Sequence, residues 1–284
     1  MKGWQALTKL TTQWVLPPGI LEYLRSHLLA KSLTQEERAI LQKNRVLNNR
    51  HAGERCFILA TGPSIKKQDL KLLRGETCIA LSNCFVHPDY KFIEPRYHCV
   101  AGYHKPIPKR GWAEWLGQME SATGKARMFF SLADREDIER KGLFSKRVIH
   151  YLQYGNLSEI PRGELDITRC LPNPQSVTIM ALEVALYMGF KNIYLLGCDH
   201  DWLLHLGTSQ HFYEENQHAL VRAGYDEWAG VDLGVQCQKY VRLWQQYRAL
   251  WQIARRKSIN IFNATEGGLL DVFPRKSYES LFAE

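Results

Sequence analysis

Beyond residue 55, short apolar runs alternate along the chain with longer segments whose apolar residues recur at helical spacing. Short apolar runs predict buried strands, and the helical period predicts amphipathic helices between them. We expect strands at Cys56–Ala60, Thr77–Leu81, Tyr97–Ala101, Arg127–Ser131, Val148–Leu152, Asn192–Leu196 and Ile259–Phe262. We expect helices at Ile65–Leu73, Trp112–Ser121, Asp134–Lys141, Ser176–Met188 and Gly234–Lys257. This alternation is typical of an α/β fold with a largely parallel sheet flanked by helices.

The first 54 residues have a different pattern, with helical periodicity and no strand-like run. We expect helices before Pro17 and at Ile20–Lys31 and Thr34–Asn48. The last of these opens on Thr34, and Glu37 three residues later completes a capping box. We therefore expect residues 1–54 to form a basic helical N-terminal extension and residues 55–284 to form one α/β catalytic domain.

Positive charge is concentrated in that extension. The chain carries 37 Lys and Arg against 29 Asp and Glu, a formal net charge of +8, and residues 1–55 hold nine Lys and Arg against four Glu. Such an arm suits an anionic surface, and Trp4 and Trp14 on one helical face suit a membrane interface. Two interpretations stay open: peripheral membrane contact through residues 1–30, or packing of this segment on the α/β domain.

The composition excludes several classes of protein. With 45% hydrophobic and 23% charged residues, the chain has the composition of an ordinary globular protein. This composition excludes disordered and fibrous proteins. No apolar stretch approaches the roughly 18 residues of a membrane span, and we expect no signal peptide. Seven cysteines without a CxxC pair fit reduced thiols in the cytoplasm. No nucleic-acid-binding motif is present, so no nucleic-acid partner is expected.

A glycine-containing loop follows the first expected strand. It consists of Thr61, Gly62, Pro63 and Ser64 and leads into a helical segment. A glycine there allows backbone to approach a ligand, a helix N-terminus favours anions, and parallel α/β sheets bind nucleotides at this strand end. The loop matches neither GxGxxG nor GxxxxGK(S/T), so ordinary dinucleotide and P-loop sites have no support. Asn83, at the end of the second strand, is expected to face the same crevice. A structural turn and a capping Asn are the alternatives.

The densest titratable cluster follows the expected strand Asn192–Leu196. Its members are Asp199, His200, Asp201, His205, His211 and Tyr213. Carboxylates and imidazoles at the carboxyl end of a strand are typical of an active site, where they can supply a general base and stabilise a phosphate. The alternatives are a metal site formed by Asp199, His200, Asp201 and His205, and histidines with structural or surface roles. In the loop after the last strand, Thr265 and Glu266 either contact substrate or cap a turn.

In this order the features resemble the bacterial sialyltransferases of glycosyltransferase family 42, and also the MptE-like proteins, which are named for an archaeal pterin pyrophosphokinase. The likeness runs over residues 56–265. It is carried by the Gly62–Ser64 loop, the strand-end Asn83, the helix led by Ser176, and the segment Gly189–Asp199. The resemblance implies a Rossmann-like, GT-A-like variant of the α/β fold.

The resemblance also implies roles for individual residues. The implied nucleotide-binding residues are Thr61, Gly62, Pro63, Ser64, Asn83, Gln175 and Ser176. Asp199 matches the Asp of the family's Gly-x-Asp, and Tyr213 is implied as a phosphate ligand with His211 as its substitute. The sequence departs from the family at Thr61, where the family usually has Asn. At Gln236–Lys239, where the family's catalytic His lies, there is no His.

The expected function is therefore metal-independent transfer of a sugar from a nucleotide-activated donor, CMP-linked and sialic-acid-like, to a glycan or lipid-linked glycan hydroxyl. His211 is expected as general base, with His200 as second choice. Asp199 or Asp201 would orient the imidazole or contact an acceptor hydroxyl. We expect the enzyme in the cytoplasm, at the inner face of the cytoplasmic membrane. A homo-oligomer is a further expectation.

Two other function classes stay open. One is an MptE-like ATP-dependent phosphotransferase, in which Asp199 and Asp201 would ligate Mg²⁺. The other is a non-catalytic nucleotide- or glycan-binding protein, which the missing family His favours. Binding of ATP only with Mg²⁺ would indicate the first, and ligand binding without turnover the second.

Overall fold

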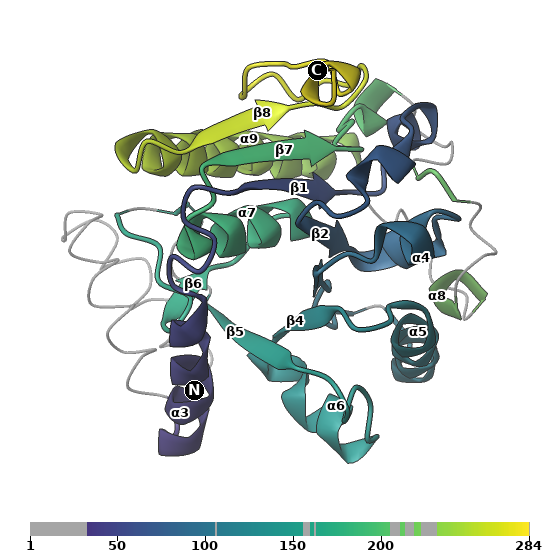
Figure 1. Cartoon of the computed structure of the whole chain (residues 1–284). Helices are drawn as coiled ribbons and strands as arrows, with labels where there is room; N and C mark the ends of the chain where they lie inside the picture. The colour runs from purple at the N-terminus through teal and green to yellow at the C-terminus, as the bar shows by residue number, and fades with distance from the viewer. Residues whose placement is uncertain are drawn as a thin grey trace.

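Parallel strands form the centre of the computed structural model, which describes residues 33–105, 107–155, 160–161, 163–204, 211–213, 219–222 and 232–283. The strands are β1 (Arg55–Leu59), β2 (Cys78–Leu81), β3 (Tyr97–Cys99), β4 (Arg127–Ser131), β5 (Ile149–Gly155), β6 (Cys170–Pro172), β7 (Asn192–Leu196) and β8 (Asn260–Asn263). Their spatial order is β6-β5-β4-β3-β2-β1-β7-β8, with each neighbouring pair parallel (Figure 1). The predicted α/β fold with a parallel sheet is confirmed.

The strand order reverses direction at β1. From β1 the chain adds β2 to β6 on one side, and it then returns to place β7 and β8 on the other side of β1. Consecutive crossovers therefore leave β1 and β7 in opposite directions, which opens a crevice at their carboxyl ends. The loop after β1 and the loop after β7 meet at that crevice.

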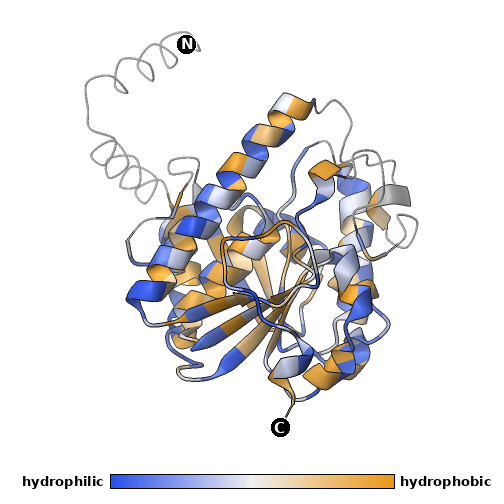
Figure 2. Ribbon diagram, turned by 90° about the horizontal axis from the view of Figure 1, so that it is seen from above, coloured by the Kyte–Doolittle hydropathy of each residue, from blue (hydrophilic) through white to orange (hydrophobic). Residues whose placement is uncertain are grey.

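Helices cover both faces of the sheet (Figure 2). Side chains of β1 alternate, so that Cys56 and Ile58 join one buried cluster and Phe57 and Leu59 join the other. The first cluster contains α7 (Val177–Met188) and α9 (Leu233–Arg256). The second contains α4 (Tyr90–Ile93), α5 (Lys109–Ala122), α6 (Arg135–Arg140) and α8 (Ala219–Arg222).

The sequence of α7 determines where this helix begins and ends. The Ser176 hydroxyl accepts a hydrogen bond from the N–H of Ile179 at 3.4 Å and caps the first turn. Every residue from Thr178 to Met188 is buried, since the helix packs between the sheet and α9. Gly189, at φ +79°, ends the helix in the left-handed conformation that glycine adopts without strain.

All the expected strands are present, but the helix expected at Ile65–Leu73 is wrong. Two 3₁₀ turns, Pro63–Lys67 and Leu70–Leu73, occupy that stretch. Gln68 is extended between them, and the carboxylate of Asp69 accepts the N–H of Lys71 to start the second turn afresh. The sequence pattern also missed β6, α4 and α8, each only three or four residues long.

The described part of the N-terminal segment packs on the sheet. Helix α3 (Gln35–Gln42) opens with the predicted capping box of Thr34 and Glu37, and a 3₁₀ turn, Lys43–Leu47, continues it. Leu41 and Leu47 are buried, and the amide of Asn44 donates to the carbonyl oxygen of Tyr151 at 2.8 Å. The predicted membrane contact of residues 1–30 lies outside the described residues. No helix among the described residues is both long and apolar enough to cross a bilayer.

Candidate functional site

The loops after β1 and β7 are bonded to each other. The N–H of Ala60 donates to the carbonyl of Leu196, and that of Gly62 donates to the carbonyl of Gly197, both at 2.9 Å. A Cβ on Gly62 would lie only 1.9 Å from Oδ2 of Asp199. Glycine is therefore required at position 62 by the close approach of the second loop, whereas its role beside a ligand stays a prediction.

Asp199 joins the two loops. Its Oδ1 accepts the backbone N–H of Ser64 at 3.1 Å, and its Oδ2 accepts the Ser64 hydroxyl at 2.8 Å. Burial raises the pKa of Asp199, and the two hydrogen bonds from Ser64 oppose that rise. The carboxylate thus caps the turn that starts after Gly62. In the structure this carboxylate binds Ser64, and the roles expected for it, orienting an imidazole or contacting an acceptor hydroxyl, stay predictions.

A cavity of about 880 Å³ lies over the carboxyl ends of the central strands and is bounded by α5, α7 and α9. Its volume is within the usual range of small-molecule sites. The predicted residues that line it are Thr61, Gly62, Asn83, Gln175, Ser176, Asp199, His200, Asp201, His211 and Tyr213. The glycine loop and the acidic, histidine-containing segment therefore face one cavity.

Pro63, Ser64, Thr265 and Glu266, also predicted as site residues, are not among those that line the cavity. The Thr265 hydroxyl accepts the N–H of Cys198 at 3.0 Å and is buried behind the loop. Glu266 forms an exposed ion pair with Lys67 at 3.2 Å. Thr265 thus holds the loop after β7 rather than capping the turn that follows it, and Glu266 lies at the surface.

His211 and Tyr213 lie against the loop after β1. The Thr61 hydroxyl and Nδ1 of His211 are 3.2 Å apart, and the N–H of Phe212 donates to the Thr61 carbonyl at 2.9 Å. The rings of His211 and Tyr213 stack with centroids 4.8 Å apart and an angle of 11° between their planes. An imidazole and a phenol are thus held together at one wall of the cavity.

His200 has a different environment, although it also lines the cavity. Its backbone is left-handed, with φ +47°, and its carbonyl accepts the hydroxyl of Tyr240 at 2.5 Å. Its Nε2 lies 2.6 Å from the hydroxyl of Tyr247. Burial lowers the pKa of His200 to about 4, so the ring is uncharged at neutral pH and is a weak proton acceptor.

Several lining residues escaped the sequence analysis. Trp115 of α5 donates its indole N–H to Oδ1 of Asn83 at 2.5 Å, and Nδ2 of Asn83 donates to the Tyr213 hydroxyl at 2.9 Å. Tyr103 and Lys239 also line the cavity. The helical spacing of Trp115 indicates only a core position, and nothing in the sequence near Trp115 points to a partner 32 residues away.

The described residues contain no group of three or more His, Cys, Asp and Glu arranged to hold a metal ion. His205, the remaining member of the alternative metal site, lies outside the described residues. Asp199, one of the two carboxylates in that alternative, is bound to Ser64.

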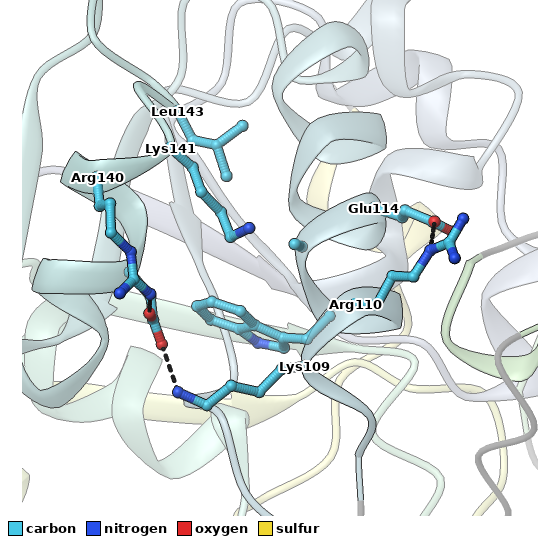
Figure 3. A pocket seen from close by; sticks show the side chains of 9 residues that line it. Lys109, Arg110, Glu114, Arg140, Lys141 and Leu143 are labelled. Carbon is cyan, nitrogen blue, oxygen red and sulfur yellow. Dashed lines mark hydrogen bonds and ion pairs between the residues drawn. The ribbon is translucent and has the colours of Figure 1, made fainter.

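A second, shallower cavity of about 600 Å³ lies between α5 and α6 (Figure 3). Lys109, Arg110, Arg140 and Lys141 surround it. Lys109 and Arg140 both pair with Asp137, and Arg110 pairs with Glu114 at 3.1 Å. Two carboxylates thus face four cationic side chains, and none of the predicted site residues lines this cavity.

Comparison with protein-family models and with curated proteins finds no match. Two solved structures are similar. One is the sialyltransferase CstII from Campylobacter jejuni in complex with a substrate analogue, cytidine-5′-monophosphate, with 12% identity, a TM-score of 0.45, and coverage of 79% of this chain and 85% of that one. The other is the sialyltransferase CST-II in complex with a trisaccharide acceptor and CMP, with 13% identity, a TM-score of 0.46, and coverage of 78% and 85%. Similarity at this level does not establish the family or the activity of this chain.

Proposed function

We propose that this protein is a glycosyltransferase that moves a sugar from a nucleotide-activated donor, CMP-linked and sialic-acid-like, to a hydroxyl of a glycan or lipid-linked glycan. The observation that carries the proposal is the pairing of His211 and Tyr213 at the Thr61–Gly62 loop, in a cavity at the point where the strand order reverses. This is the position at which parallel α/β sheets bind nucleotides.

In this proposal, the residues around the loop after β1 bind the nucleotide-sugar donor. Thr61 and Gly62 line the cavity, so their backbone and the Thr61 side chain are available to contact a phosphate or ribose. Gln175 and Ser176 stand at the start of α7, where the positive end of the helix dipole favours an anion. Lys239, from α9, adds a cation to the same cavity.

The acceptor hydroxyl must lose a proton as the bond between the sugar and the phosphate breaks. An imidazole is the usual general base near neutral pH, and His211 is the stronger candidate because the pKa of His200 is lowered to about 4. Tyr213 lines the same cavity, and its hydroxyl is the group that we propose stabilises charge on the departing phosphate. The reaction as proposed needs no metal ion.

The basic N-terminal segment supports a peripheral location on the inner face of the cytoplasmic membrane. Such a location suits a lipid-linked acceptor. The proposal includes membrane contact through residues 1–30, which vesicle sedimentation tests. It also includes self-association, which analytical ultracentrifugation tests.

The first experiment is a thermal-shift series with CMP, CDP, UDP, GDP and ATP, each with and without Mg²⁺. A ligand that binds only the folded state raises the melting temperature, and we expect CMP to do so without metal. A response to ATP that requires Mg²⁺ would instead indicate a phosphotransferase.

The second experiment measures sugar transfer from a CMP-linked donor. We expect His211→Ala to lower kcat at least 100-fold, the usual contribution of a general base. His200→Ala should act mainly on stability, because its partners are Tyr247 and Tyr240. Unchanged transfer by the His211 variant would remove the proposed base, and CMP binding without any turnover would indicate a non-catalytic protein.

A further inference from the structure

The side-chain amide of Asn83 lies between two aromatic residues that come from distant parts of the chain. Trp115 of α5 contacts it on one side at 2.5 Å, and Tyr213 contacts it on the other at 2.9 Å. All three residues line the central cavity and are at most 7% exposed. The amide is therefore held by two hydrogen bonds that water does not compete for.

The chemistry of the indole fixes the direction of both bonds. An indole N–H can only donate, so the amide atom that faces Trp115 must be the oxygen. The amide nitrogen then faces Tyr213, and because an NH₂ group can only donate, the phenol oxygen must accept from it. The phenol proton is consequently directed away from Asn83.

The ring of Tyr213 is fixed as well. It stacks on His211 at 4.8 Å, and a phenol proton prefers the plane of its ring. Because Nδ2 of Asn83 donates to the phenol oxygen, the O–H is directed to an acceptor other than Asn83. The hydrogen bond from Asn83 also makes the phenol a better donor, since hydrogen bonds in a chain polarise one another.

We infer that Trp115 is a positioning residue of the cavity, which acts through Asn83 to present the Tyr213 hydroxyl as a hydrogen-bond donor to an anionic oxygen of the ligand, such as a phosphate oxygen. The inference rests on the proposed function for the nature of the ligand. The order Trp115 to Asn83 to Tyr213 rests on the described hydrogen bonds alone. Replacing Trp115 by a residue without a donor frees the amide to turn over, and the tyrosine then donates to Asn83 instead of to the ligand.

The test is a double-mutant cycle with Trp115→Phe and Tyr213→Phe, read by the affinity for CMP and for cytidine. We expect Tyr213→Phe to weaken CMP binding about tenfold or more, as for loss of a hydrogen bond to a charged group. Trp115→Phe should weaken it about three- to tenfold. Cytidine, which has no phosphate, should lose less than about twofold in both variants.

The double variant decides how Trp115 acts. If it acts through the Tyr213 hydroxyl, Trp115→Phe costs no further affinity once that hydroxyl is gone. Losses that multiply in the double variant, or an equal loss for cytidine and CMP, would overturn the inference, because either result indicates a general packing effect.

Trp112→Phe is the matched control for folding. Trp112 is on the same helix and is also 2% exposed, but its indole N–H has no hydrogen-bond partner in the described structure. The same ring exchange at position 112 therefore loses no hydrogen bond. We expect Trp115→Phe to lower the melting temperature more than Trp112→Phe does, and an equal drop would contradict the Trp115–Asn83 bond.

A ligand-free measurement separates this inference from the proposed function. In amide NMR spectra, the side-chain NH₂ signals of Asn83, assigned by their loss in Asn83→Leu, should shift in both Trp115→Phe and Tyr213→Phe. If CMP does not bind the wild-type protein, the proposed donor is wrong, and these shifts still decide the order of the hydrogen bonds. Signals that move in neither variant would overturn the inference whatever the ligand.

Discussion

At Gly62 the loop after β1 passes so close to the loop after β7 that no side chain fits. Gly62→Ala would place a Cβ 1.9 Å from Oδ2 of Asp199 and 2.6 Å from the carbonyl oxygen of Gly197. To relieve this clash the carboxylate must leave Ser64, which separates the two loops that bound the cavity. We expect a loss of about 3 kcal/mol in the free energy of unfolding, and loss of CMP binding with it. Urea denaturation and the thermal-shift assay measure the two effects.

Gly117→Ala is the control for this substitution. Gly117 lies inside α5, and a Cβ there meets no atom within 4 Å. Alanine in a helix interior is better than glycine by about 0.5–1 kcal/mol, so this variant should be slightly more stable than the wild type. A Gly62→Ala variant as stable as Gly117→Ala would show that the loops are not bonded as described.

Glu183 predicts a measurable pH dependence of stability. Its side chain is fully buried in α7, and burial raises its pKa well above the ordinary value of 4.5. A group that binds its proton more tightly when folded stabilises the folded state fully below its unfolded pKa, and that stabilisation is lost as pH rises through its folded pKa. Between its unfolded pKa and its raised folded pKa, Glu183 therefore lowers the free energy of unfolding steadily as the pH rises.

Glu183→Gln removes this contribution. We expect the gain in stability of the variant over the wild type to grow between pH 5 and pH 8 in urea denaturation. Glu114→Gln, at a side chain that is 54% exposed and paired with Arg110, serves as the comparison and should change stability by less than about 0.5 kcal/mol at either pH. A gain for Glu183→Gln that is the same at both pH values would rule out a buried, proton-binding carboxyl.

For single residues, the sequence predicted well which side chains lie at the cavity. It predicted less well which partner each side chain binds. Asp199 and His211 follow β7 in the chain, and the carboxyl ends of parallel strands share one edge, so their presence at the cavity follows from the pattern. The partner of Asp199 does not, because Ser64 lies 135 residues away and the pairing depends on how the loops pack. The same holds for Asn83 and Tyr213, which are 130 residues apart.

Among the elements, helix α7 connects stability with the cavity. Ser176→Ala removes the cap of its first turn, and a lost cap costs about 1 kcal/mol. Because Ser176 also lines the cavity, we expect this variant to lose CMP affinity in addition to stability. Melting temperature and CMP titration are the two measurements.

Thr34→Ala provides the matched control for this element. Thr34 caps α3 through a complete capping box, so its loss should cost a similar amount of stability. Thr34 is not among the residues that line the cavity, so CMP affinity should stay within about twofold of the wild type. If both variants lose affinity equally, the effect of Ser176→Ala is one of overall stability and not of the site.

The elements that the sequence predicted are those with long or strongly periodic patterns. The central strands are apolar on both faces, and α7 and α9 are each at least twelve residues long. The elements it missed are short. Strand β6 has three residues, ends in Pro172 and pairs at the edge of the sheet, so its position depends on β5 and not on its own pattern. The error at Ile65–Leu73 has a local cause, because Asp69 bonds to nearby backbone and stops one turn from continuing into the next.

For the molecule as a whole, the position of the cavity depends on the strand order. Alternating strands and helices predict a parallel sheet, but they do not determine on which side of β1 the returning strand β7 is placed. With β7 beside β1, the Gly62 loop and the Asp199 loop become neighbours, and their hydrogen bonds follow. The function proposed for the cavity thus depends on one long-range pairing between residues far apart in the sequence.

Contacts made by residues 33–54 determine where the folded unit begins. A chain of residues 55–284 lacks Leu41 and Leu47, which are buried, and His51, which stacks on Phe190 at 4.4 Å. Burial of each leucine contributes about 1.5–3 kcal/mol, so the two together approach the lower end of the about 5–15 kcal/mol by which an ordinary domain is stable. We expect residues 55–284 to show no cooperative melting transition by circular dichroism. A chain of residues 33–284 keeps all these contacts and should melt cooperatively, whereas equal melting of the two chains would show that the α/β domain is complete from residue 55.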